Sequence, residues 1–350
     1  MGITMKDNGL QCSIFDGENP LKITKPLRLI ELFAGIGAQA KALENLCVNF
    51  EHYRICEFDK YAVASYNAVH GTNFKTSDIT QIHAEDLGIV ETDKYEYIMT
   101  YSFPCTDLST AGKQKGMSRD SGTRSGLLWE VERLLKETKE LPQILLMENV
   151  PDVLSEKNRK DFFFWCEFLE SLEYTSKYAI LNAKDFGVPQ NRERCFMLSW
   201  LGKDYYYDFP LKKPLVVRLK DILDTSVDEK YYLSKKNIDC VLKWKSYKNP
   251  FDGICGDNSI SPTITTRVVD SASMILYSNK LSERSIIKDK EELKHLSIRR
   301  LTEKECWRLM GFDDESFERA EKVVSNSQLY KQSGNSIVVN VLMAIFKNLF

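Results

Sequence analysis

Residues 28–40 read Arg-Leu-Ile-Glu-Leu-Phe-Ala-Gly-Ile-Gly-Ala-Gln-Ala and indicate the fold class. The run through Phe33 is apolar and of strand length, and a helical stretch follows to about Cys47. Between them lies the pattern G-x-G-x-x-A, in which glycines permit a tight turn and let a ligand approach the backbone. Strand, glycine turn and helix form the first unit of a nucleotide-binding α/β fold.

A second strand and helix are predicted over residues 53–57 and 61–69. Glu57, at the end of this strand, lies 20 residues after Gly37. At this spacing a carboxylate can accept hydrogen bonds from both ribose hydroxyls of a bound nucleotide. The pattern fits NAD, FAD or S-adenosylmethionine, and purely structural roles for the glycines and Glu57 stay open.

The alternation of strands and helices continues along the chain. In open parallel sheets the ligand crevice lies at the carboxyl ends of the strands. Five special or polar residues are each predicted to follow a strand, and we expect them to line one crevice: Gly35, Glu57, Asp78, Cys105 and Glu148.

Cys105 closes the segment Ser102-Phe-Pro-Cys, which follows a strand-like run and precedes a loop, residues 112–126, rich in Gly, Lys, Ser and Arg. Pro104 fixes the local backbone, and Lys113 or Lys115 favours the thiolate, which is the nucleophilic form. No histidine lies nearby in the sequence, so Glu148, acting as an acid, is the better candidate partner. A Cys–His pair and an inert cysteine remain alternatives; the four histidines are His52, His70, His83 and His295.

Gln190, Arg192 and Arg194 alternate, so they share one face of an extended segment that enters a strand. Two guanidinium groups and an amide on one face form a fixed array of donors for carbonyl or phosphate oxygens. The same spacing fits a solvated strand edge equally well.

The composition is that of an ordinary globular protein, with 43% hydrophobic and 28% charged residues in a chain of 350. No apolar run reaches the roughly 18 residues of a membrane span, and the N-terminus lacks the features of a signal peptide. The nine cysteines include no C-x-x-C pair, which argues against a zinc site or a disulfide framework. We therefore expect a cytoplasmic protein with no metal.

Patterning divides the chain into an irregular lead-in, a catalytic and cofactor-binding domain, and a smaller, mostly β or irregular domain with a return segment: residues 1–27, residues 28–199 plus 325–350, and residues 200–324. Residues 201–300 hold 19 Lys and Arg against 14 Asp and Glu, although the whole chain has a net charge of −2. This basic segment permits a localised nucleic-acid face. Thr302 and Glu305 predict a capping box before an amphipathic helix, and residues 337–349 predict an apolar helix.

Seven segments, in order, resemble the motifs of the DNA (cytosine-5) methyltransferase family of bacterial or phage type. They are Leu32-Phe-Ala-Gly-Ile-Gly37, Glu57-Phe-Asp-Lys60, Ser77-Asp-Ile-Thr80, Phe103-Pro-Cys105 with Gly112-Lys-Gln-Lys-Gly116, Glu148-Asn-Val150, Gln190-Asn-Arg-Glu-Arg194 and Gln332-Ser-Gly-Asn-Ser336. Each segment is a weak signal, but the set is specific and leaves out only residues 1–27 and most of 200–295. Ala38 and Thr106 depart from the family pattern, and neither removes a catalytic group.

The resemblance implies a Rossmann-like S-adenosylmethionine-dependent methyltransferase domain, with residues 200–324 forming a target-recognition domain and its return segment. Cys105 would add to carbon 6 of cytosine while Glu148 protonates or hydrogen-bonds ring N3. Arg194 would hold the cytosine O2, and Arg192 would orient Glu148. Carbon 5 would then attack the methyl group of S-adenosylmethionine, and loss of the carbon-5 proton would release the thiol. The base has to be flipped out of the duplex, at a cost of roughly a few kcal/mol.

The resemblance also implies which residues contact the cofactor and the DNA. The cofactor would be held by Phe33, Gly35, Gly37, Glu57, Phe58, Asp78, Ile79 and Asn335. Double-stranded DNA would be contacted by Ser109, Lys113, Gln114, Lys115 and Arg267, with Thr263, Thr265 and Thr266 as further candidate base readers. Arg267 could contact guanine bidentately, and a phosphate contact or a surface role fits it at least as well. The loop 112–126 would close on the DNA, and Gln114 would enter the vacated stack.

Three rival interpretations remain. A transfer-RNA cytosine methyltransferase has the same chemistry, but the variable segment of about 100 residues favours groove reading of duplex DNA. A dinucleotide-dependent oxidoreductase would leave Cys105, Glu148 and the two arginines without roles. An inactive DNA-binding protein would not need an intact Cys105 and Glu148. We expect a monomeric enzyme, with or without a cognate restriction endonuclease in the same system.

Overall fold

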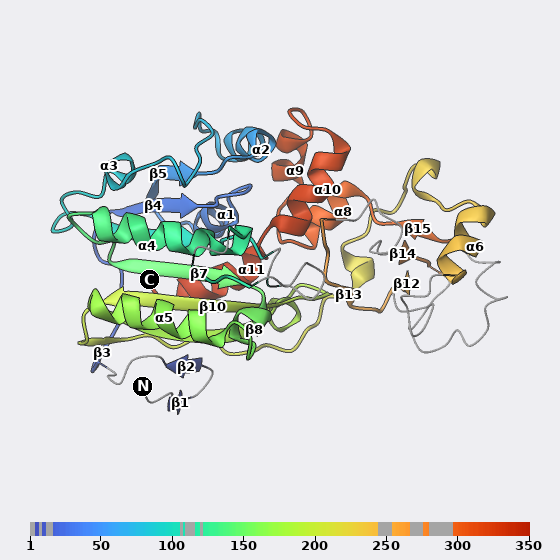
Figure 1. The fold of residues 1–350 in the computed structure, drawn as a ribbon. Helices are drawn as coiled ribbons and strands as arrows, with labels where there is room; N and C mark the ends of the chain where they lie inside the picture. Colours follow the sequence, from blue (N-terminus) through green and yellow to red (C-terminus); the bar gives the residue numbers. More distant parts are fainter. Residues whose placement is uncertain are drawn as a thin grey trace.

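The computed structural model is built on one mixed β-sheet with helices on both faces (Figure 1). The structure describes residues 4–6, 9–11, 17–105, 108, 116–119, 122–243, 254–266, 276–279 and 297–350. Among these residues, no helix is both long and apolar enough to span a membrane.

The main sheet has eight strands: β1 (Thr4–Lys6), β2 (Gly9–Gln11), β4 (Leu27–Leu32), β5 (Phe50–Cys56), β6 (Glu96–Tyr101), β7 (Ile144–Asn149), β8 (Tyr174–Asn182) and β10 (Glu193–Leu201). Their order across the sheet is β1-β2-β8-β10-β7-β6-β4-β5. The four strands from β5 to β7 in this order are parallel, whereas β10 runs antiparallel to β7 and β8. Short strands outside the main sheet are β3 (Asn19–Pro20), β9 (Gln190–Asn191), β11 (Tyr205–Tyr206), β12 (Ile254–Cys255), β13 (Ser261–Pro262), β14 (Leu276–Tyr277) and β15 (Arg299–Arg300).

The α-helices are α1 (Ala38–Asn45), α2 (Lys60–His70), α3 (Ala84–Leu87), α4 (Leu128–Glu137), α5 (Arg159–Ser171), α6 (Lys235–Lys243), α8 (Glu303–Arg308), α9 (Asp314–Ala320), α10 (Asn326–Asn335) and α11 (Val339–Lys347). Single 3₁₀ turns lie at η1 (Arg124–Leu127), η2 (Pro151–Leu154), η3 (Ala183–Phe186), η4 (Leu219–Asp221) and η5 (Glu229–Tyr231).

Alternating side chains of the central strands enter two separate hydrophobic cores. In β7, Leu146 belongs to the core with α1 and α11, whereas Leu145 and Met147 belong to the core with α4 and α5. A strand buried on both faces needs a nearly continuous apolar run, which is what residues 144–147 supply. The result is the expected α/β architecture in three layers, with α4 and α5 covering one face of the sheet (Figure 1).

The first strand-turn-helix unit forms where the sequence predicts it. β4 ends at Leu32, residues 33–37 form the turn, and α1 begins at Ala38. The strand predicted before Asp78 is absent: residues 72–78 form no ladder with the edge strand β5. A hydrogen bond from the Ser77 N–H to the Glu57 carbonyl, at 2.9 Å, holds this segment near the end of β5.

The lead-in of residues 1–27, predicted to be irregular, contains short strands among its described residues. β1 and β2 form a hairpin, and β2 pairs antiparallel with β8, which extends the main sheet. Farther along, β3 pairs with β11. Strands of two or three residues carry no readable periodicity, and β2 adds to the sheet because the edge of β8 offers hydrogen-bonding groups.

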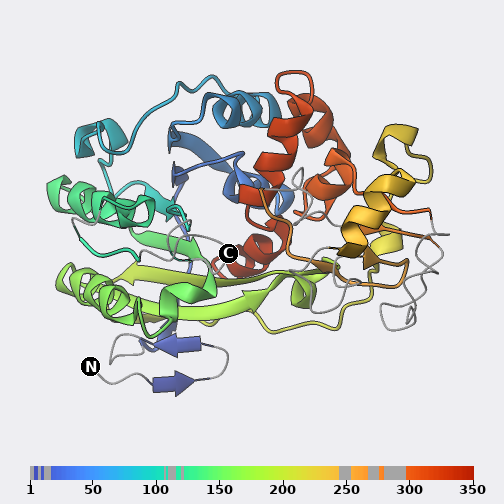
Figure 2. The ribbon, with the colours of Figure 1, turned by 45° about the vertical axis from the view of Figure 1, so that its right-hand side comes forward.

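The boundary of the smaller domain also lies earlier than the predicted residue 324. Helices α8 and α9 contribute Trp307 and Phe317 to the same hydrophobic core as α1 and α11, and α9 packs on α2. The remaining described elements of the segment, from α6 to β15, lie beyond these helices at one end of the molecule in both views (Figures 1 and 2). α6 is a helix that the mostly β or irregular prediction missed.

Candidate active site

The carboxyl edge of the sheet brings Glu148 and Arg194 together. Glu148 is the penultimate residue of β7, and Arg194 is the second residue of the antiparallel neighbour β10. Phe196 pairs with Glu148, so Arg194 lies diagonally across from the carboxylate on the same face. The Arg194 Nε is 3.2 Å from Glu148 Oε1. Because β10 is antiparallel, its beginning meets the ends of the parallel strands.

Glu148 is set up to hold a proton. The residue is 8% exposed, and burial raises the pKa of its carboxyl, although Arg194, Arg192 and Ser102 lower it. A carboxylic acid in such a site can donate a proton or hydrogen bond near neutral pH.

No hydrogen bond or ion pair joins Arg192 to Glu148, two described residues, although the Arg192 charge lowers the pKa of that carboxyl; the orienting role stays a prediction. Its guanidinium donates to the carbonyls of Ile264 at 2.8 Å, Gly334 at 3.1 Å and Ser336 at 2.7 Å. Arg192 precedes β10 and lies past the end of β7, so it faces the C-terminal segment instead. Burial and the Arg194 charge lower the pKa of Arg192 to about 9, and it remains charged at neutral pH.

Cys105 is partly buried near this carboxylate. Burial and the Glu148 charge raise the pKa of the Cys105 thiol, while Arg194 and Arg192 lower it. Two hydrogen bonds hold the backbone just before Cys105. Asn149 Nδ2 donates to the Phe103 carbonyl at 2.9 Å, and Ser125 Oγ donates to the Pro104 carbonyl at 2.7 Å.

Asn149 and Ser125 are residues that the sequence analysis did not single out as part of the site. Asn149 follows Glu148 directly, so the end of one strand supplies both the acid and the support of the cysteine loop. The only local signal was the Glu148-Asn-Val segment. Nothing in the sequence near Ser125 indicates that it reaches Pro104.

The expected cofactor turn has an unusual backbone. Phe33, Gly35 and Gly37 have positive φ angles of 59°, 56° and 78°. The Phe33 N–H donates to the Cys56 carbonyl at 2.7 Å, which anchors the turn to the end of β5. A Cβ at Gly35 would meet no atom within 4 Å, so one side of the turn is open to a ligand. A positive φ in a residue with a side chain, as in Phe33, is costly and is a frequent feature of functional sites.

Glu57 braces this turn from the neighbouring strand. Its Oε2 accepts the Gly35 N–H at 3.0 Å and its Oε1 accepts the Asp59 N–H at 2.8 Å, while burial raises the pKa of its carboxyl. Phe58, next to it, is 71% exposed. An aromatic ring this exposed beside a strand end is free to stack on a planar ligand.

Other predicted cofactor residues lie around the same strand ends. Ile79 is buried, and the exposed Asp78 accepts the Thr80 N–H at 2.9 Å. Asn335 is exposed at the end of α10. α10 is fastened beside Glu57 by an ion pair between Lys331 and Asp59 at 2.7 Å.

The predicted DNA contacts Ser109, Lys113, Gln114, Lys115 and Arg267 lie outside the described residues. The candidate base reader Thr263 is described, and its hydroxyl donates to the Asn191 carbonyl at 2.7 Å. The Ile264 N–H donates to Gln190 Oε1 at 3.0 Å, and β13 pairs with β9. These bonds hold residues 261–264 against the core, next to the arginines.

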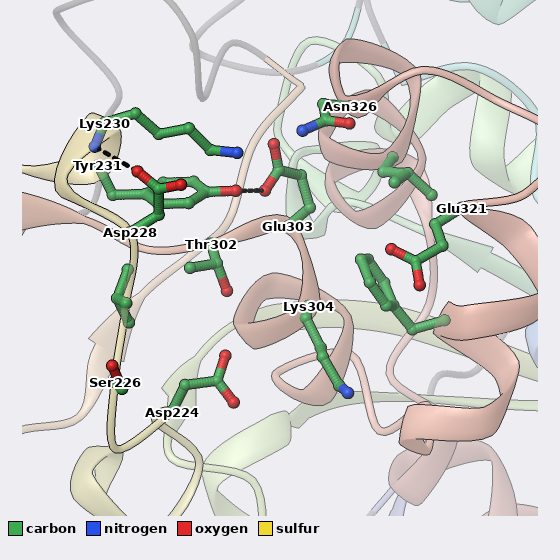
Figure 3. A pocket seen from close by; sticks show the side chains of 13 residues that line it. Asp224, Ser226, Asp228, Lys230, Tyr231, Thr302, Glu303, Lys304, Glu321 and Asn326 are labelled. Carbon is green, nitrogen blue, oxygen red and sulfur yellow. Dashed lines mark hydrogen bonds between the residues drawn. The ribbon is translucent and has the colours of Figure 1, made fainter.

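A separate hollow of about 300 Å³ lies between residues 224–231 and helices α8–α10 (Figure 3). Within its walls the Tyr231 hydroxyl donates to Glu303 at 2.5 Å, whereas Asp224 and Lys304 form ion pairs with residues outside the hollow. None of Cys105, Glu148 or Arg194 lines it, so it is not part of the candidate site.

The chain has clear relatives among known proteins. The model of the family described as C-5 cytosine-specific DNA methylase matches residues 27–350. The chain is 34% identical to the Type II methyltransferase M2.ScrFI of Lactococcus lactis subsp. cremoris, over 93% of this chain and 99% of that protein. It is 32% identical to the Orphan methyltransferase M.SssI of Spiroplasma monobiae, over 92% of this chain and 97% of that protein.

Two solved structures share the fold. The Entamoeba histolytica methyltransferase EhMeth superposes with a TM-score of 0.76 at 20% sequence identity, covering 93% of this chain and 98% of that one. The S. pombe Dnmt2 methyltransferase superposes with a TM-score of 0.71 at 22% identity, covering 92% and 98%.

Proposed function

The chain belongs to the C-5 cytosine-specific DNA methylase family, and we propose that this DNA (cytosine-5-)-methyltransferase transfers the methyl group of S-adenosylmethionine, through a covalent Cys105 adduct, to a flipped-out cytosine. The observation that carries this proposal is the meeting of three groups at one sheet edge. Cys105, the acid Glu148 and the cation Arg194 come from β6, β7 and β10 and influence one another electrostatically.

These three groups can divide the chemistry on the cytosine ring. Carbon 5 is a poor nucleophile until the Cys105 sulfur bonds to carbon 6, which makes the ring an enamine. Glu148, whose pKa is raised by burial, can deliver a proton or a hydrogen bond to ring N3 as that bond forms. Arg194 carries donors suited to the ring O2. After transfer, loss of the carbon-5 proton and cleavage of the carbon–sulfur bond restore the aromatic ring and the thiol.

The residues at the ends of β4 and β5 fit the cofactor. The turn is open in front of Gly35, and each Glu57 oxygen still has a lone pair for a ribose hydroxyl after accepting one N–H. Phe58 offers an exposed aromatic face for the adenine. Ile79, Asp78 and Asn335 would complete the pocket. When bound, S-adenosylmethionine supplies an activated methyl group.

Specific double-stranded DNA is the proposed substrate. A base inside a duplex cannot reach Cys105 and Glu148 together, so the target cytosine has to be flipped out. The basic segment 201–300 would carry the base-reading residues, Arg267 among them. Such an enzyme would act as a monomer in the bacterial cytosol or nucleoid, with or without a restriction endonuclease of the same specificity.

Bisulfite sequencing of DNA from cells that express the protein tests the activity. New 5-methylcytosine at one sequence context is the expected result, whereas unchanged DNA in the presence of folded protein would refute the proposal. If transfer RNA is methylated and DNA is not, the protein is instead a transfer-RNA cytosine methyltransferase.

The Cys105→Ser variant tests the nucleophile. We expect the methyl-transfer rate to fall roughly a thousandfold or more, because the hydroxyl is a far weaker nucleophile, while S-adenosylmethionine binding is retained. Cys47→Ser, at the exposed Cys47, is the matched control and should keep full activity. Turnover by Cys105→Ser at the wild-type rate would remove Cys105 from the mechanism.

A further inference from the structure

His70 lies directly behind the cofactor turn, at the end of α2. Its side chain is fully buried. A Cβ at Gly37 would come within 2.3 Å of His70 Nε2, so only glycine leaves room for the ring at this point of the turn. The imidazole therefore contacts the turn at residues 36–37, whereas Glu57 holds it at Gly35.

Both ring nitrogens of His70 face acceptors. Nδ1 is 2.6 Å from Glu44 Oε1 and Nε2 is 3.1 Å from the Ile36 carbonyl. A neutral imidazole has one N–H and can donate to only one of these oxygens, whereas the imidazolium has two. Two facing acceptors favour the doubly protonated ring, with the Glu44 carboxylate as its counter-ion.

The groups around His70 form one hydrogen-bonded cluster, in which the second histidine, His52, is neutral. The Tyr66 hydroxyl donates to Glu31 Oε2 at 2.5 Å, so its oxygen accepts from His52 Nδ1 at 3.2 Å. Burial and the His70 charge lower the pKa of His52 to about 4, which keeps that ring neutral. The charged and titratable groups facing this cluster are Glu44 and Lys41 of α1, His52 of β5, Tyr66 of α2, Glu31 of β4 and, at the end of α2, Arg319 of α9.

Glu44, His52 and His70 also have the composition of a metal site. However, the 2.6 Å between His70 Nδ1 and Glu44 Oε1 is a direct hydrogen bond. A tetrahedral zinc ion about 2 Å from each ligand would hold the two atoms about 3.3 Å apart. The spacing favours a shared proton over a shared ion.

We propose that His70 is a positioning residue for cofactor binding: its imidazolium, anchored by Glu44, holds the Ile36 carbonyl and fixes the turn of residues 33–37 in its open, positive-φ conformation. The inference rests on the proposed use of S-adenosylmethionine by this turn. His70 touches neither substrate nor cofactor and acts through the backbone.

His70→Gln, which keeps a donor but cannot be a cation, tests the proposal by isothermal titration with S-adenosylmethionine. The dissociation constant should rise about fivefold to tenfold, because one of the two bonds is lost. The KM for S-adenosylmethionine should rise with it, while kcat and the KM for DNA stay near their wild-type values. The matched control is His83→Gln, since His83 is 70% exposed, and it should bind the cofactor like the wild type.

The protonation state gives a second readout that does not depend on a variant folding. Nitrogen NMR of the wild-type protein should show both ring nitrogens of His70 protonated, each as the donor of one of the two hydrogen bonds. A singly protonated ring near neutral pH, or unchanged affinity in folded His70→Gln, would overturn the proposal. If the wild type fails to bind S-adenosylmethionine, the proposed function fails instead.

Discussion

At the scale of single residues, the chemistry depends on how the protein treats one carboxyl group. Glu148 is buried and its pKa is raised, yet Arg194 lies 3.2 Å away and opposes that shift. The burial has the larger effect, so the folded site favours the neutral acid more than water does. Cys105 has the opposite requirement, because only its thiolate can attack.

These opposed requirements predict the pH profile of kcat/KM. The active form has a protonated Glu148 and an ionised Cys105, so activity should fall toward acid pH as the Cys105 thiolate is protonated and toward alkaline pH as Glu148 loses its proton. In Glu148→Gln the rate should drop by about 10²–10⁴ and the alkaline fall should disappear, because only thiolate formation still depends on pH. Steady-state methylation rates across pH measure both. A variant that keeps the wild-type alkaline limb would exclude Glu148 as the acid.

At the scale of elements, the N-terminus of helix α8 combines a local capping box with an ion pair to strand β15. Thr302 Oγ1 accepts the Glu305 N–H at 3.1 Å and Glu305 Oε2 accepts the Thr302 N–H at 2.8 Å, which confirms the predicted capping box. The same Glu305 carboxylate also receives both terminal nitrogens of Arg299 at 2.8 Å. The helix start is therefore locked to β15, at the exit of the smaller domain.

We predict that Glu305→Gln destabilises the protein more than Thr302→Ala. The first variant leaves the buried Arg299 charge without its counter-ion, a loss of roughly 3–5 kcal/mol, whereas losing the cap hydroxyl costs about 0.5–2 kcal/mol. Urea unfolding followed by tryptophan fluorescence compares them. Glu315→Gln, which breaks an exposed pair with Arg319, is the control and should change stability by less than about 1 kcal/mol. Equal losses in the two test variants would contradict this ranking.

At the scale of the whole molecule, three distant segments converge on Arg192. Its guanidinium joins the start of β10 to Ile264, in the smaller domain, and to Gly334 and Ser336, near the C-terminus. Gly334 has no room for a side chain, since a Cβ there would lie 2.4 Å from backbone atoms of Thr265 and Thr266. The base-reading segment proposed here is thus docked on the cofactor side of the molecule.

Gly334→Ala tests this docking. Alanine favours a helix more than glycine does, so any loss of stability reports the clash with residues 265–266 and not a weaker helix α10. We expect destabilisation of about 1–3 kcal/mol and weaker binding of substrate DNA, measured by thermal unfolding and fluorescence anisotropy. Ser327→Ala, at an exposed position of the same helix, should change neither. Full stability in Gly334→Ala would show that the two segments can separate freely.

Features that depend on a few neighbouring residues could be predicted from the sequence. The strand, glycine turn and helix of residues 28–45, the capping box of α8 and the position of Cys105 after β6 are encoded by local spacing and side-chain type. The missing strand before Asp78 and the hairpin of β1 and β2 could not be predicted. The pairing of β2 depends on the edge of β8, which a distant part of the chain supplies.

The sequence alone determined the α/β class, the family resemblance and the candidate residues Cys105, Glu148, Arg192 and Arg194, because each is carried by a short motif. Only the tertiary structure decided what these residues touch. Through the antiparallel register of β10 on β7, Arg194 forms the ion pair with Glu148, whereas Arg192 donates hydrogen bonds to the C-terminal segment. Register and burial arise from contacts between residues far apart in the chain, and burial is what raises the pKa of Glu148.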